Sequence, residues 1–108
     1  MRIFCIGRNY AAHAAELKNE LLTEPVVFIK PESCLVQEDE RIMFPRHGKK
    51  LHHEAELVVR IGQDSSFVTE AEAVSLISHL GIGLDLTLRD VQEELKTKKL
   101  PWEKAKAF

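Results

Sequence analysis

The sequence predicts an α+β fold, and two kinds of pattern support this prediction. Runs rich in β-branched and aliphatic residues, such as Val26–Pro31 and Leu51–Gly62, are typical of strands. Residues 69–81 carry apolar side chains at helical spacing after a capping motif, which is typical of a helix. Because the chain has only 108 residues, we expect residues 1–108 to belong to a single domain.

The composition narrows the classes of partner. The chain is 44% hydrophobic and 30% charged, with a formal net charge of −2. This charge gives no basic excess for nucleic acid, and no apolar run approaches the roughly 18 residues that a membrane span requires. The two cysteines, Cys5 and Cys34, fit no metal or redox spacing. We therefore expect a cytoplasmic protein with reduced cysteines that binds neither nucleic acid nor a membrane.

The N-terminal half should contain strands, a helix and a charged loop. Residues 2–6 and 26–31 have the composition of short strands. Between them, the alanine-rich residues 9–21 predict a helix. Residues 37–50 hold the densest charge in the chain, which predicts a loop interrupted by a short strand at Ile42–Phe44.

The C-terminal half should contain two strands and two helices. Residues 51–62 predict a strand, and Thr69 with Glu72 forms a capping box that opens a helix closed by Gly81. The next residues alternate strictly between apolar and polar side chains, which predicts a strand. Its apolar members are Leu84, Leu86 and Leu88, and its polar members are Asp85, Thr87 and Arg89. Asp90 resembles an N-cap for a last helix that ends before Pro101.

Three carboxylates occupy positions that suit a metal ion. Glu54 and Glu56 lie two residues apart in a predicted strand, so both point to the same face. If the strand of Asp85 lies nearby, the three could form an all-oxygen site, which favours magnesium, manganese or calcium over zinc. From spacing alone, the simpler interpretation is that the two glutamates lie on the solvent-exposed face of a half-buried strand.

A histidine and a glutamate form a second candidate site. His13 and Glu16 are three residues apart on a predicted helix and therefore lie side by side. A carboxylate beside an imidazole can orient it and raise its basicity, which suits the activation of water. Read without further context, an ordinary surface pair explains the same spacing.

Four segments stand out in chain order, namely CIGRNYAAHAAEL, FIKPESCL, LHHEAELVVRIG and GLDLTLRDVQEELKTKKLPWEKAKAF. Together they resemble the fumarylacetoacetate hydrolase family, in particular its acylpyruvate hydrolase and oxaloacetate decarboxylase branch. Each motif is modest alone, but four in the same order across nearly the whole chain are specific. The resemblance implies the N-terminal part of the family's mainly-β sandwich roll.

The resemblance also implies roles for individual residues. The family's magnesium or manganese would lie on Glu54, Glu56 and Asp85, and His13 with Glu16 would activate water. Substrate oxygens would be held by four further residues, which are Arg8, Arg89, Gln92 and Lys106. These residue types suit the task, because arginine grips a carboxylate in a fork and lysine offers a point charge to an enolate.

The implied reaction is cleavage of a C–C bond in a small 2-oxo acid or 1,3-dicarbonyl substrate. His13 would deprotonate the attacking water, and Lys106 would help the departing fragment leave as an enolate. Oxaloacetate decarboxylation or keto–enol tautomerisation needs the same enolate without the water. The alternative from another class is an inactive half-domain that binds metal or a partner.

The resemblance covers only part of the family's catalytic domain, which is roughly twice this long. We therefore expect residues 1–108 to be an incomplete catalytic domain of this family. Half of a roll would leave strand edges and apolar side chains uncovered, Leu84, Leu86 and Leu88 among them. We accordingly expect a homo-oligomer or association with the remaining half of the domain.

Overall fold

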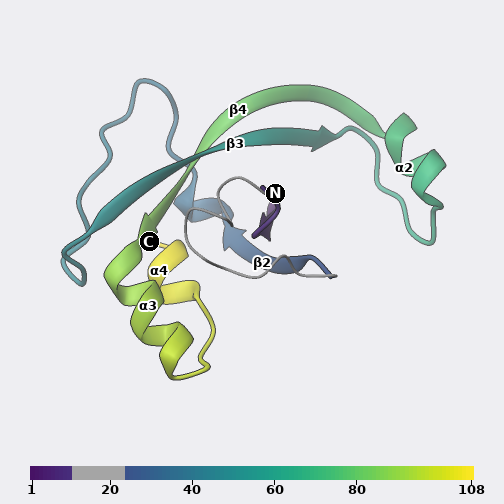
Figure 1. Ribbon diagram of the computed structural model, residues 1–108. Helices are drawn as coiled ribbons and strands as arrows, with labels where there is room; N and C mark the ends of the chain where they lie inside the picture. Colours follow the sequence, from purple (N-terminus) through teal and green to yellow (C-terminus); the bar gives the residue numbers. More distant parts are fainter. Residues whose placement is uncertain (11–23) are drawn as a thin grey trace. The chain divides into compact units, whose positions relative to one another are not determined.

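The computed structural model describes residues 1–10 and 24–108, which form two compact units. The first unit comprises residues 1–51 and 88–108, and the second comprises residues 52–87. Figure 1 shows the elements in chain order. No helix of the described part is long and apolar enough to cross a membrane.

A two-stranded antiparallel sheet organises the first unit. Strand β1 (Arg2–Gly7) pairs with β2 (Val26–Pro31), so that Phe4 lies opposite Ile29 and Cys5 opposite Phe28. Side chains alternate between the two faces of this sheet. One face, which we call the outer face, carries large apolar side chains that remain 41–59% exposed, namely Phe4, Ile6, Val27 and Ile29. The other face is more buried and includes Phe28.

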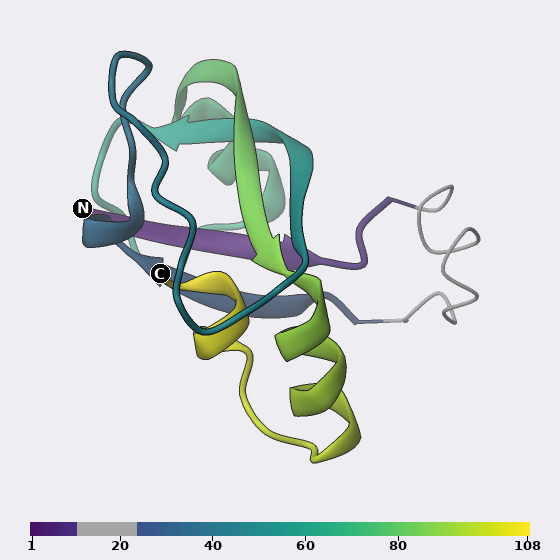
Figure 2. The ribbon, with the colours of Figure 1, turned by 90° about the vertical axis from the view of Figure 1, so that its left-hand side faces the viewer.

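A 3₁₀ helix and two α-helices complete the described part of the first unit. The short 3₁₀ helix η1 (Glu32–Cys34) follows β2, and helices α3 (Arg89–Thr97) and α4 (Glu103–Lys106) lie next to each other near the C-terminus (Figure 2). Helix α4 contacts β2. The most buried apolar residues of the unit are Leu88, Leu95 and Ala105.

A long hairpin forms the second unit. Strand β3 (Leu51–Ile61) is followed by helix α2 (Glu70–Ser75) and by β4 (Ile77–Leu88), which pairs with β3 and runs in the opposite direction (Figure 1). At the turn end, the Gly62 N–H donates to the Leu76 carbonyl at 2.9 Å. The capping box predicted for α2 is present, because Glu72 and Thr69 exchange hydrogen bonds.

Several sequence predictions of strands are confirmed and one is wrong. The strands expected at residues 2–6, 26–31 and 51–62 are present as β1, β2 and β3. The short strand expected at Ile42–Phe44 is not, since these residues are irregular and Met43 is 79% exposed. Among the described residues, no strand pairs with these three apolar residues. The helix expected at residues 9–21 falls largely outside the described residues.

The helix expected at residues 69–81 is much shorter than predicted. Helix α2 ends at Ser75, and the last residues of the expected helix belong to β4. An alternation of apolar residues begins at Leu80 and runs to Leu88, so a period of two overrides the helical spacing. Because β3 offers a partner, the backbone groups of this segment are satisfied by the strand instead.

The last predicted helix is present as α3 and ends before Pro101, but its first turn differs from the expectation. Helix α3 begins at Arg89 after Leu88, and the N-cap makes no side-chain hydrogen bond. The carboxylate of Asp90, expected to cap the helix, instead accepts from the backbone N–H groups of Lys49 and Lys50. Helix α4, after Pro101, is absent from the sequence predictions.

Candidate functional site

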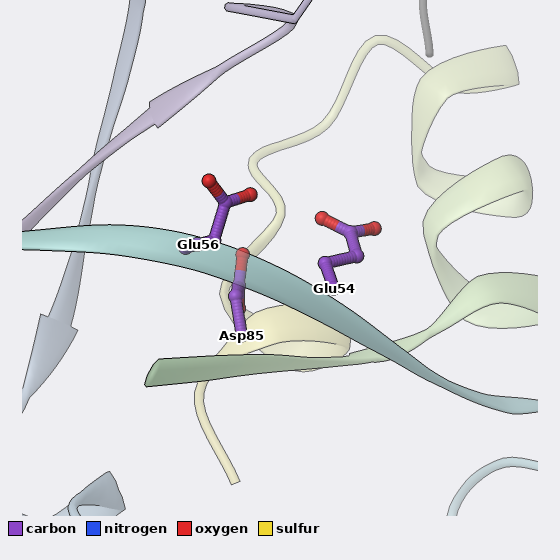
Figure 3. Close-up of side chains that lie close together, drawn as sticks. All are labelled: Glu54, Glu56 and Asp85. Atoms are coloured by element: carbon purple, nitrogen blue, oxygen red, sulfur yellow. The ribbon is translucent and has the colours of Figure 1, made fainter. Parts of the chain in front are cut away.

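Three carboxylates converge on the β3–β4 hairpin. Glu54 and Glu56 alternate with outward-facing residues on β3, and Asp85 projects from β4 on the same side (Figure 3). One carboxylate oxygen from each residue lies within 4.8 Å of the others, and all three residues are half-buried. The pleat of β3 places the two glutamates on one face, and the pairing of β3 with β4 brings Asp85 next to them.

The arrangement fits a hard divalent cation. Metal–oxygen bonds of about 2.1–2.5 Å place neighbouring ligand oxygens about 3–3.5 Å apart and opposite ones about 4–5 Å apart. The separations among these carboxylate oxygens fall within that limit. Since all three donors are oxygens, magnesium, manganese or calcium suits them better than zinc. Gathering three negative groups without a cation would cost free energy through mutual repulsion.

A group of buried polar residues lies in the first unit. The exposed fractions of Arg89, Gln92 and Lys106 are only 7%, 3% and 3%. Residues of these types are rarely this buried. Arg89 donates from Nη1 to the Gln92 side-chain oxygen at 2.5 Å, one turn along α3. Burying a charge is costly unless it is compensated, so the partners of Arg89 and Lys106 matter for the stability of this group.

The backbone at Arg89 is fixed by a loop that precedes β3. The Arg89 N–H donates to the Lys50 carbonyl at 2.8 Å, and the Asp90 carboxylate accepts from the Lys49 N–H at 2.9 Å. The hydrogen bond from Lys49 favours the charged carboxylate and holds the pKa of Asp90 below its usual value. The loop therefore anchors the first turn of α3, which begins at Arg89.

Arg8 has an unusual backbone and an unpartnered side-chain nitrogen. Its φ of 57° lies in the left-handed region, which costs free energy for a residue other than glycine. Its Nε is buried and has no hydrogen-bond partner among the described residues. A buried donor without a partner is costly, so an incoming acceptor such as a carboxylate would be favoured here.

The candidate site residues named from the sequence fall into three groups. Glu54, Glu56 and Asp85 come together in the second unit. The four residues expected to hold substrate all belong to the first unit, namely Arg8, Arg89, Gln92 and Lys106. His13 and Glu16 lie outside the described residues. The chemical role of each residue stays a prediction.

Sequence reasoning missed Phe28, which contacts one of the buried polar residues, and Trp102, which contacts Phe28. Phe28 lies beneath the ammonium of Lys106, and its ring is 5.9 Å from that of Trp102. A signal was available in part, because Trp102 and Lys106 are four residues apart and share a helix face. The approach of β2 to that face was not visible in the sequence.

The family description "Fumarylacetoacetate (FAA) hydrolase C-terminal" matches residues 2–108 of this chain. Oxaloacetate tautomerase FAHD1, mitochondrial, of Mus musculus is 43% identical over 106 residues, which is 98% of this chain and 48% of that protein. Oxaloacetate tautomerase YcgM of Escherichia coli is 44% identical over 107 residues, 99% of this chain and 49% of that protein.

A solved structure agrees with these matches. Fumarylpyruvate hydrolase from Pseudomonas aeruginosa, in complex with Mn²⁺ and pyruvate, superposes with a TM-score of 0.91 and 34% identity. The superposition covers 100% of this chain and 48% of that one. The chain thus spans about half the length of the relatives it matches. With a family match over residues 2–108, the chain belongs to the fumarylacetoacetate hydrolase family.

Proposed function

We propose that this chain carries metal-binding and substrate-binding residues of an enzyme that stabilises the enolate of a small 2-oxo acid. The observation that carries the proposal is the convergence of Glu54, Glu56 and Asp85. A bound Mg²⁺ or Mn²⁺ would polarise the keto oxygen as a Lewis acid. Relatives that are 43–44% identical bear the name oxaloacetate tautomerase, so keto–enol tautomerisation of oxaloacetate is the first candidate.

The buried polar residues suit the binding of such a substrate. Arg89 is held by Gln92, so its guanidinium is oriented for a carboxylate without further ordering. Arg8 offers a buried donor that has no partner among the described residues. Lys106 would place a positive charge near the oxygen on which negative charge develops when a proton leaves the adjacent carbon.

Hydrolysis of a C–C bond in an acylpyruvate is the second candidate. One relative of known structure is named fumarylpyruvate hydrolase and holds Mn²⁺ and pyruvate. Hydrolysis needs an activated water in addition to the enolate, and His13 with Glu16 would supply it. Oxaloacetate decarboxylation shares the enolate and is the third possibility on the same residues.

The test compares three substrates on one preparation. The chain is freed of metal with a chelator and assayed with enol oxaloacetate, keto oxaloacetate and acetylpyruvate, before and after Mn²⁺ or Mg²⁺ is restored. The proposal expects metal-dependent turnover that is lost in Glu56→Gln. Faster keto–enol equilibration of oxaloacetate without loss of CO₂ identifies a tautomerase, formation of pyruvate and CO₂ from keto oxaloacetate identifies a decarboxylase, and release of pyruvate from acetylpyruvate identifies a hydrolase. Without metal-dependent turnover of any substrate, the chain is an inactive half-domain.

Three further expectations from the sequence remain proposals. We propose that the β1–β2 sheet and the β3–β4 hairpin belong to a mainly-β sandwich roll of which residues 1–108 are one part. The cytoplasmic location is also a proposal, and the mouse relative's name contains the word mitochondrial. The third concerns partners, where a second copy of the chain or the remaining half of the domain would cover the exposed apolar side chains.

A further inference from the structure

The ring of Phe28 contacts two groups of the C-terminal segment at once. The Lys106 ammonium lies 5.2 Å from the centre of the Phe28 ring, and the Trp102 ring lies 5.9 Å from it at an angle of 59°. The Lys106 N–H donates to the Trp102 carbonyl, so one helical turn brings both side chains to the same face. A single side chain of β2 therefore serves as a platform for this turn.

The position of the platform depends on a close approach between β1 and Trp102. A Cβ added at Gly7 would lie 3.3 Å from Trp102 Cζ3 and 3.6 Å from Phe28 Cε1. The first of these separations is tight, so a larger residue at this position would push the indole away. Gly7 thus leaves the space in which the two rings meet.

The charge of Lys106 is buried, so an aromatic face beside it is favourable. Only 3% of the residue is exposed, although a lysine side chain has four rotatable bonds and a strongly hydrated head. An aromatic face attracts a cation within about 6 Å, and the attraction grows when water is excluded. The Phe28 ring therefore compensates part of the lost hydration and restricts where the ammonium can lie.

We propose that Phe28 is a positioning residue that holds the Lys106 ammonium for enolate stabilisation. The effect on turnover rests on the function proposed above, whereas the contact between ring and ammonium does not. Because the ring acts on a charge used as the enolate forms, its loss should lower kcat more than it raises KM. A purely packing role would lower stability without this split.

The first experiment measures the contact itself. Nuclear magnetic resonance of the full chain, with Lys106 assigned through the Lys106→Arg variant, reports the ring current of Phe28 as an upfield shift of the Lys106 ε-methylene protons. The shift should persist in Phe28→Tyr and disappear in Phe28→Leu. Phe4→Leu is the matched control, since Phe4 lies on the neighbouring strand but on the outer face. No upfield shift in the unmodified chain, or an unchanged shift in Phe28→Leu, overturns the proposal.

The second experiment tests the electrostatic role with little change in shape. Phenylalanine 28 is replaced by its 4-fluoro, 3,5-difluoro and 3,4,5-trifluoro analogues, which progressively weaken the negative face of the ring. We expect kcat for the substrate that is turned over to fall stepwise, by about 2- to 30-fold in total, with KM nearly constant. A flat kcat across the fluorinated series refutes positioning. A chain without turnover refutes the proposed function. In that case the upfield shift of the Lys106 ε-methylene protons alone tests whether Phe28 holds the ammonium.

Discussion

The carboxylate of Asp90 accepts a hydrogen bond from the backbone N–H of Lys49, 41 residues earlier in the chain, at 2.9 Å. This bond is the largest cause of the lowered pKa of Asp90. A carboxyl group whose pKa is lowered by folding contributes stability above its unfolded pKa, about 3.9 for aspartate. The contribution is lost as the pH falls through the lower pKa of the folded state.

We therefore expect Asp90→Asn to melt at a lower temperature than the unmodified chain at pH 7. The two melting temperatures should converge as the pH falls below about 4, because the carboxyl group of Asp90 then becomes protonated in both states. Thermal melting followed by circular dichroism between pH 7 and pH 2 measures this. Asp64→Asn, in the exposed loop after β3, serves as the control and should show no such convergence. A constant difference across the range contradicts the prediction.

A second prediction concerns the loop that anchors α3. A Cβ at Gly48 would lie 2.7 Å and 2.9 Å from the two methyl groups of Leu88, which is fully buried. Gly48→Ala should therefore destabilise the fold by about 1–3 kcal/mol, the usual cost of overpacking. Gly81→Ala is a matched control, because no atom of the described residues outside its chain neighbours lies within 4 Å of its added methyl. Chemical denaturation should separate the two, and equal stabilities would show that Leu88 yields easily.

A third prediction concerns His13. If this residue activates water, His13→Ala should lower the rate of acetylpyruvate hydrolysis by about 10²–10⁴-fold, the usual range for a general base. Tautomerisation or decarboxylation of oxaloacetate should suffer less, because neither consumes a water. The comparison of the rate losses is the measurement, with His53→Ala as a control on an exposed histidine. An unchanged hydrolytic rate removes His13 from the mechanism.

A fourth prediction follows from the outer face of β1 and β2. Apolar side chains that are half-exposed on one sheet face favour association. The residues are Phe4, Ile6, Val27 and Ile29. Light scattering on a sample verified by mass spectrometry should give a molar mass above that of one chain, and the double variant Val27→Lys, Ile29→Lys should reduce it. A monomer that melts cooperatively would mean that the 108 residues are stable without a partner.

Local patterns predicted most of the strands but not the extent of the long hairpin. The β-branched runs of β1, β2 and β3 identify strands without reference to the rest of the chain. The segment that contains Ile77 and Leu80 carries both a helical and a strand spacing, and the neighbouring β3 decides between them. Helix α4 has only four residues, which is too short for a periodic signal.

The candidate site was predictable to a similar degree. The spacing of Glu54 and Glu56 places them on one face, but only the partner strand brings Asp85 to them. The roles of Arg89 and Lys106 came from the family resemblance, since spacing does not reveal that a charged residue is buried. Phe28 was missed because its importance depends on a contact with a segment more than seventy residues later.

The three carboxylates belong to two different strands, and this division has a consequence for the dynamics of the hairpin. An ion that binds Glu54, Glu56 and Asp85 together binds only while β3 and β4 remain paired. Ligand binding to the closed form alone lowers the population of the open form. The bound ion would therefore link β3 and β4 reversibly. Adding Mn²⁺ or Mg²⁺ should slow amide hydrogen exchange along both strands, while exchange in α3 changes little.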